Sequence, residues 1–242
     1  DKIVNFARAV IGHVRGGLGM SNVLACTLFG GVSGSPGADV SAMGAVMIPM
    51  MKKEGYHADY AVNVTTHAAL VGALMPTSHN MIIYTLAASG KVSIAALILA
   101  GIIPAIILTI CNLVAAYAVA VKRGYPAGTF PGWSIVARTF AAALPGLFVV
   151  ALILIGILSG IFTATESAAI AIIYTLVLTV FLYRTLKWEH FLKAATKAVK
   201  TTGTILLLIG ISATFGYLIS LYGVAELTGA ALEQMTTTPW VI

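Results

Sequence analysis

The sequence predicts an all-α integral membrane protein in which transmembrane helices accompany a re-entrant helical hairpin and a broken helix. Of the 242 residues, 59% are apolar and only 9% are charged, whereas soluble globular domains carry about 25% charged residues. The apolar residues gather in long runs, as in helices that need about 20 residues to cross a bilayer. Clusters of glycine, serine and proline interrupt two of these runs, at 30–37 and 72–80.

The charged residues favour a membrane protein over a nucleic-acid binder. The 14 Lys and Arg residues outnumber the 8 Asp and Glu residues, but they lie between the apolar runs, as is typical of cytoplasmic loops. Cys26 and Cys111 lie inside apolar segments without metal-ligand spacing, which favours inert thiols over a disulfide or a metal pair. The chain begins at Asp1 without a methionine and ends at 239–242 without a terminal loop, so we expect a piece of a longer protein.

The first two segments are an amphipathic surface helix, 1–15, and a re-entrant hairpin, 16–51. Apolar residues recur at helical spacing in the first segment, which is typical of a helix on a membrane surface. The glycine-rich stretch at 30–37 divides the second segment into halves of about 15 residues, too short to cross the bilayer. Arg15 and Lys52 flank the segment, so the preference of basic residues for the cytoplasm places both of its ends on that side.

The next segments are a broken transmembrane helix with its return helix, 58–121, and a cytoplasmic connector, 122–138. The interruption at 72–80 contains Pro76, which removes a backbone donor and restricts the residue before it. Two transmembrane helices are expected at 139–186.

The last segments are an amphipathic connector, 187–201, and a transmembrane helix with the start of the next segment, 202–242. Before them, Thr163 stands three residues ahead of Glu166, which predicts a capping box at a helix start. With both hairpin ends in the cytoplasm, simple alternation places every Lys and Arg except Lys91 on that side. The topology is therefore self-consistent.

The two interruptions are the strongest indication of function. Irregular backbone at membrane depth leaves amides and carbonyls unpaired, which is tolerated where they are buried in protein or line a cavity. Transporters use such breaks to bind anions at helix N-termini and sodium at exposed carbonyls. The oxygens of Ser33, Ser35 and Thr77, with carbonyls around Gly72 and Met75, could bind sodium.

Motifs along nearly the whole chain resemble the large membrane subunit of tripartite ATP-independent periplasmic (TRAP) transporters. These motifs are Gly-His-x-Arg-Gly-Gly-Leu-Gly at 12–19, Ser-Gly-Ser-x-x-Ala-Asp at 33–39, Gly44, Pro49, Lys-Lys-x-Gly-Tyr at 52–56, Gly-x-x-x-Pro-x-Ser at 72–78 and Gly-x-Phe-Thr-x-Thr-Glu at 160–166. The combination is specific. It implies a multi-pass protein of the bacterial inner membrane.

The resemblance further implies an elevator-type, sodium-coupled importer of an organic carboxylate. Its partners would be a small four-helix membrane subunit (Q) and a periplasmic substrate-binding protein (P). Members consist of two inverted repeats, so this chain would hold the latter half of the first repeat and the opening of the second. The second hairpin and second sodium site would lie beyond Ile242. The carboxylate (C4-dicarboxylate, sialic acid or sugar acid), the number of coupled ions and any fusion of the small subunit stay open.

The site residues that the resemblance implies fall into two groups. The sodium site maps onto Ser33, Ser35, Gly72, Met75 and Thr77, and the substrate-binding or gating residues are Gly34, Asp39, Ser78, His79 and Asn80. The family pattern usually has a second proline where Thr77 stands. A threonine keeps the carbonyl and adds a hydroxyl, so coordination survives while the local kink becomes less certain.

Each of these residues also has a structural interpretation. Asp39 could cap the second hairpin helix, and the two serines could satisfy a tight turn. His79 and Asn80 could contact substrate or fill the core. His67 and Glu166 are expected to be structural.

Three other functions are open to a membrane protein of this kind. An intramembrane enzyme could use Asp39, Glu166 and the histidines, but a metal-binding pattern such as His-Glu-x-x-His is missing. A structural scaffold gives no reason for two breaks at membrane depth. A channel is the third. The sequence therefore favours a transporter rather than an enzyme.

Overall fold

The computed structural model describes residues 2–87, 92–184, 186–224 and 226–228. Contacts divide the chain into two units, 1–182 and 183–242, and each is described by itself. The helices of the first unit are α1 (Lys2–Ile11), α2 (Gly17–Ser33), α3 (Pro36–Lys53), α4 (Ala58–Ala69), the 3₁₀ turn η1 (Leu70–Leu74), α5 (His79–Ala87), α6 (Ile94–Lys122), α7 (Trp133–Leu158), α8 (Ala164–Val177) and the π-helical turn η2 (Leu178–Leu182). The second unit holds α9 (Trp188–Leu221). The described part of the chain is all-α.

Four segments are long and apolar enough to cross a membrane. They are Ile94–Lys122, Trp133–Leu158, Thr165–Leu182 and Trp188–Leu221. The third begins at the predicted capping box, which is confirmed: the Thr163 amide donates to Glu166 Oε2 (2.8 Å), and the Glu166 amide donates to Thr163 Oγ1 (3.2 Å). The chain is therefore an α-helical membrane protein.

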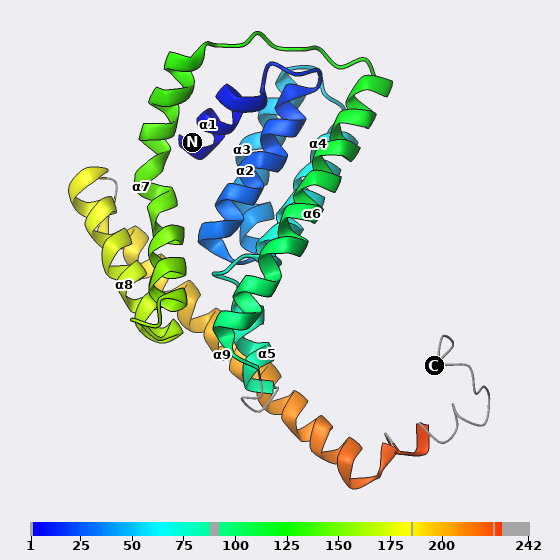
Figure 1. Ribbon diagram of the computed structural model, residues 1–242, viewed down its shortest axis with the longest axis vertical. Coiled ribbons are helices and arrows are strands. Elements are labelled where there is room, and N and C mark those ends of the chain that lie inside the picture. The colour runs from blue at the N-terminus through cyan, green and yellow to red at the C-terminus, as the bar shows by residue number, and fades with distance from the viewer. Residues whose placement is uncertain (1, 88–91, 185, 225, 229–242) are drawn as a thin grey trace. The chain divides into compact units, whose positions relative to one another are not determined.

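The segment predicted as the hairpin forms two helices, α2 and α3, that pack side by side (Figure 1). Only Gly34 and Ser35 separate them. Gly34 ends α2 in the left-handed conformation (φ 61°), and its amide donates to the Gly30 carbonyl (2.8 Å). Pro36 then occupies the first position of α3, where its fixed φ favours a helix start. Glycine and proline thus reverse the chain within two residues.

The segment predicted as a broken helix is interrupted at the expected place. Helix α4 tightens into the 3₁₀ turn η1, and Met75 is then extended (φ −77°, ψ 154°). The extended conformation follows from Pro76, since a proline disfavours helical geometry in the residue before it. Helix α5 begins at His79.

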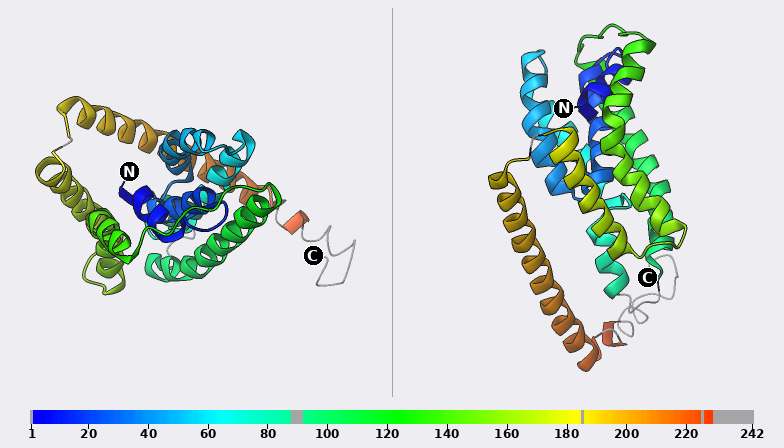
Figure 2. Two further views of the ribbon diagram at one scale, coloured as in Figure 1. Left: turned by 90° about the horizontal axis from the view of Figure 1, so that it is seen from above. Right: turned by 90° about the vertical axis from the view of Figure 1, so that its left-hand side faces the viewer.

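Helix α2 lies at the centre of the first unit and contacts α1, α3, α4, α6 and α7. In the view from above, α1 lies between α2 and α7, both of which it contacts (Figure 2). A buried hydrogen bond joins α2 to α4: Asn22 Nδ2 donates to Thr65 Oγ1 at 2.6 Å, and neither residue is exposed. The same amide lies 3.8 Å from the sulfur of Met51 on α3. One polar side chain therefore connects the hairpin with the broken helix.

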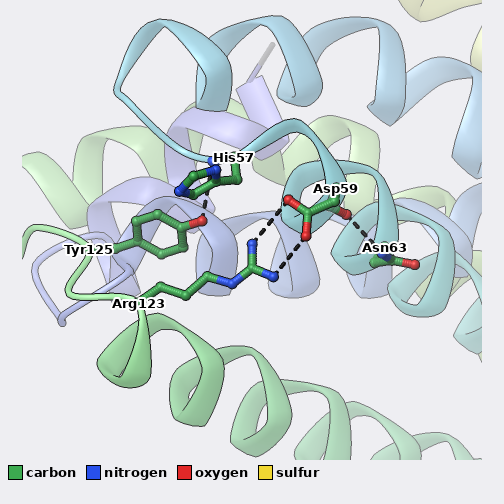
Figure 3. Close-up of polar contacts among 5 residues, drawn as sticks. All are labelled: His57, Asp59, Asn63, Arg123 and Tyr125. Carbon is green, nitrogen blue, oxygen red and sulfur yellow. Dashed lines mark hydrogen bonds and ion pairs between the residues drawn. The ribbon is translucent and has the colours of Figure 1, made fainter.

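The loop between α6 and α7 packs against the α3–α4 turn (Figure 3). The ring of Tyr125 lies against those of Tyr56 and Tyr60, with centroid distances of 4.4 and 5.1 Å. The Tyr125 hydroxyl also accepts a hydrogen bond from the His57 amide (3.1 Å). The start of the predicted cytoplasmic connector, 122–138, is therefore packed against the rest of the first unit.

Some boundaries differ from the prediction. Helix α7 starts at Trp133, inside the predicted connector 122–138. The predicted connector 187–201 and the span after it form one continuous helix, α9, so the prediction of two separate elements is wrong there. No proline interrupts α9, and Gly203 alone is too weak a helix breaker to end it. The end of the last predicted segment, 229–242, lies outside the described residues.

Candidate functional site

The hairpin tip lies directly against the break in the second segment. A Cβ atom added to Gly34 would lie 2.2 Å from the Thr77 carbonyl oxygen and 2.8 Å from the Ser78 nitrogen. One helical turn earlier, a Cβ added to Gly30 would lie 2.9 Å from the Cα atom of Gly72. The two interruptions, about 40 residues apart in the sequence, thus meet through their backbones.

The hydroxyl of Thr77 fastens the break to the end of α2. It donates to the carbonyl of Gly31 at 3.0 Å and lies 3.4 Å from the carbonyl of Gly30. Carbonyls in the last turn of a helix have no partner within the helix. The Thr77 hydroxyl therefore caps the C-terminal end of α2. The backbone carbonyl of Thr77 faces Gly34.

Asp39 is completely buried where the tip and the break meet. Its Oδ1 accepts a hydrogen bond from the Ser33 hydroxyl. Its Oδ2 has no hydrogen-bond partner among the described residues and faces two glycines: Cβ atoms added to Gly30 and Gly72 would lie 2.9 and 2.4 Å from it. The N-cap of α3 is Ser35, so the alternative that Asp39 caps this helix is wrong.

The remaining predicted residues lie either at the tip and the break or at the start of α5. Ser35 belongs to the tip, and its amide donates to Ser33 Oγ (3.2 Å), so the serines also support the turn. The carbonyl of Met75 accepts from the Ser78 amide (2.8 Å), while the buried Ser78 hydroxyl has no partner in the described part of the chain. His79, half-buried, and Asn80, exposed, begin α5. No recorded hydrogen bond connects these two side chains with the hairpin.

The depth of the site follows from its contact with α6. A Cβ added to Gly101 would lie 2.9 Å from the Leu74 carbonyl oxygen, next to the break. The midpoint of residues 94–122 is residue 108, so Gly101 lies about 10 Å along the helix axis from the middle of α6. Half the hydrocarbon thickness is about 15 Å. If α6 spans the bilayer, the break lies within the hydrocarbon.

The chemistry of the site fits a hard, singly charged cation. A buried carboxylate oxygen without a partner is costly unless a positive charge compensates it. Hydroxyls and backbone carbonyls are the uncharged oxygen ligands that such an ion accepts. Over the described residues, no cluster of three or more His, Cys, Asp or Glu suited to a transition metal occurs.

Sequence reasoning missed two contributions. Gly30 forms one wall of the Asp39 environment, and the Gly30-Gly31 pair inside an apolar run is a signal that could have identified it. The Asn22–Thr65 hydrogen bond joins residues 43 apart. Of these two residues, Asn22 could have been identified from the sequence, because it is an amide within an apolar run.

Similarity to known proteins extends over the whole chain. The family model described as "Tripartite ATP-independent periplasmic transporter, DctM component" matches residues 1–242. A C4-dicarboxylate TRAP transporter large permease protein, DctM, from Pseudomonas aeruginosa is 32% identical over 99% of this chain and 56% of its own length. An ectoine/5-hydroxyectoine large permease, UehC, from Ruegeria pomeroyi is 36% identical over 90% of this chain and 51% of its own.

A third relative is the sialic acid TRAP transporter large permease protein SiaM from Vibrio cholerae, which is 32% identical over 100% of this chain and 56% of its own length. The chain thus spans about half the length of the curated relatives it matches.

Proposed function

The chain belongs to the DctM-component family of tripartite ATP-independent periplasmic transporters, and from this premise we propose that it acts as a large permease subunit in sodium-coupled uptake of an organic carboxylate. The family consists of transporter permeases, not enzymes. Four helices suited to spanning support a multi-pass protein of the bacterial inner membrane.

The sodium site lies between the hairpin tip and the break. Asp39 provides the negative charge, and Ser33 holds its carboxylate in place. Ser35 with the carbonyls of Gly72, Met75 and Thr77 completes the set of oxygens that would hold the ion. Bound sodium would supply the positive charge that balances the buried carboxylate.

One observation carries this proposal: Asp39 Oδ2 is buried, has no hydrogen-bond partner in the part of the chain that the structure describes, and faces the backbone of Gly30 and Gly72. A carboxylate in a purely structural role would be expected to have both oxygens bonded. Here glycines from both breaks let Oδ2 pack against their backbones and offer it no side-chain donor. That arrangement is expected where an ion, rather than a side chain, completes the site.

The substrate binds next to this site through its carboxylate. The relatives are described as permeases for C4-dicarboxylates, sialic acid and ectoines, and each of these compounds carries a carboxylate. Gly34, Ser78, His79 and Asn80 surround the N-termini of α3 and α5, where backbone amides favour an anion. The substrate contacts these residues after the tip and break have been ordered by the ion.

Two further subunits complete the transporter. The description of the family as tripartite and periplasmic supports a small four-helix membrane subunit and a periplasmic substrate-binding protein that delivers the substrate. The close packing of tip, break and α6 supports transport by movement of a rigid block, as in an elevator.

Replacing Ser33 with Ala is expected to raise the sodium concentration for half-maximal uptake about tenfold, because Asp39 loses the hydroxyl that orients it. Ser35→Ala should act in the same direction. Uptake of labelled succinate, N-acetylneuraminate and ectoine is measured in proteoliposomes that contain the assembled transporter. Ser41→Ala is the matched control, since this exposed hydroxyl bonds the Gly37 carbonyl of its own helix (2.8 Å). Unchanged sodium activation in a well-folded Ser33→Ala protein contradicts the proposal.

A further inference from the structure

A line of polar side chains on α4 and α6 is separate from the cation site. Asn63 and His67 lie one turn apart on α4 and are exposed, and Asn112 on α6 is half-buried. All three line a cavity of about 310 Å³ between these helices. We refer to Asn63, His67 and Asn112 as the polar seam.

Two further residues that line this cavity, Asp59 and Arg123, form an ion pair (Figure 3). The guanidinium of Arg123 binds both carboxylate oxygens of Asp59, at 3.0 and 2.7 Å. This bidentate pair joins the start of α4 to the end of α6. The polar seam begins beside it at Asn63.

The end of the polar seam farther from the ion pair, at His67 and Asn112, lies deep in the spanning region. Asn112 lies four residues, or about 6 Å along the axis, from residue 108, the middle of α6. Asn112 Nδ2 donates to the His67 carbonyl (3.3 Å), so His67 lies at the same depth. About 15 Å is half the hydrocarbon thickness. Water is therefore not the ordinary surrounding of these groups.

The groups that the polar seam presents include three hydrogen-bond acceptors. The amide nitrogens of Asn63 and Asn112 each donate one of their two N–H groups to a backbone carbonyl, so each keeps a second donor. His67 Nδ1 lies 2.8 Å from the Asn63 carbonyl, and because a carbonyl only accepts, this nitrogen carries the proton. His67 Nε2 and the Oδ1 atoms of Asn63 and Asn112 remain. For these atoms no donor is recorded within the described residues.

We propose that the polar seam is an interhelical contact surface, covered in the assembled permease by a further membrane helix that carries hydrogen-bond donors such as Ser, Thr, Asn, Gln or Trp. Acyl chains offer no donor, so acceptors facing lipid at this depth would be costly. Polar side chains are a recognised means of joining membrane helices.

Two observations indicate a protein helix as the occupant. Ala115 and Ala116 line the same cavity, and small residues allow a second helix to approach closely. The curated relatives are nearly twice as long as this chain, so permeases of the family contain further chain that could supply the helix. The inference concerns assembly and does not depend on the cation site.

Spin-label accessibility in the assembled transporter tests the occupant. Labels are placed at Asn63→Cys and His67→Cys in a Cys111→Ala background, which leaves only the buried Cys26. A helix over the polar seam predicts low collision rates with both oxygen, which enters lipid, and a nickel chelate, which stays in water. The control is Val114→Cys, exposed on the opposite side of α6. Its oxygen collision rate should be several-fold higher.

Two outcomes overturn the proposal. An oxygen collision rate at position 67 equal to that at 114 would mean that acyl chains cover the polar seam. A high nickel rate would mean a water-filled cavity.

A pair of substitutions tests the hydrogen bonding itself. His67→Leu is expected to shift the unfolding equilibrium of the assembled transporter roughly threefold toward the unfolded state, the size of one interhelical hydrogen bond in a membrane. His67→Gln keeps an acceptor and should recover most of that loss. A leucine variant as stable as the original protein would contradict the proposal.

Discussion

Replacing Asp39 with Asn is expected to abolish sodium-driven uptake and to weaken sodium binding about a hundredfold or more. The substitution keeps the shape of the side chain but removes the only charge that the described residues place at the junction of tip and break. A buried charge deprived of its partner typically costs 3–5 kcal/mol, so the ion binds far more weakly once the carboxylate is neutral.

The measurement needs no substrate. The thermal unfolding of the permease is compared in sodium chloride and choline chloride, because a ligand that binds only the folded state stabilises it more as its concentration rises above its Kd. Without sodium, Asp39→Asn should be at least as stable as the original protein, since an uncompensated buried charge has been removed. With sodium, the original protein should gain stability and the variant should not.

The matched control is Glu54→Gln. This carboxylate is exposed beyond the far end of α3, where it pairs with Arg8 at 3.1 Å. Exposed ion pairs contribute little, so its sodium response should remain. If Asp39→Asn loses stability in choline and still responds to sodium, Asp39 is structural and the proposed site is wrong.

Gly34→Ala is expected to cause the largest loss of folded protein of any single methyl addition at the tip. The left-handed conformation of this residue costs a non-glycine residue about 1–2 kcal/mol. The added carbon would also overlap the Thr77 carbonyl at 2.2 Å, and neither backbone can rotate away as a side chain would. The tip must therefore separate from the break, and the sodium-dependent stabilisation should disappear with it.

Gly37→Ala is the control for this change. Gly37 lies three residues further on, at the start of α3, and a Cβ there meets no heavy atom within 4 Å. Alanine also favours a helix over glycine by up to about 1 kcal/mol. Thermal unfolding of both variants, each with and without sodium, should show a large loss for Gly34→Ala and none for Gly37→Ala. Equal behaviour would contradict the contact between tip and break.

Much of this fold could be predicted because the features that interrupt helices are local. Gly34 with Pro36 ends one helix and starts the next, and the capping box at Thr163 and Glu166 follows from side-chain chemistry alone. The error at α9 has the opposite cause. A change from charged to apolar residues looks like a boundary, but it does not break a helix that lacks proline.

The candidate site was only partly predictable. Local motifs identify Ser33, Asp39 and Thr77, but not their pairing, because pairing depends on how two segments pack. That the Ser33 hydroxyl faces Asp39, and that Thr77 caps α2, can be seen only once the tip meets the break. Hydrogen-bond acceptors on exposed helix faces, such as His67 Nε2, can likewise be identified only once the exposed face of each helix is known.

The capping of α2 by Thr77 limits how the site can be reached. Swinging the tip outward on its own would break the hydrogen bond from the Thr77 hydroxyl to the Gly31 carbonyl and leave that carbonyl without this donor in an apolar medium. A hairpin held in this way is poorly suited to act as a gate that opens by itself. Under the transport function proposed above, hairpin and break would then move together past their surroundings to open to each face of the membrane in turn.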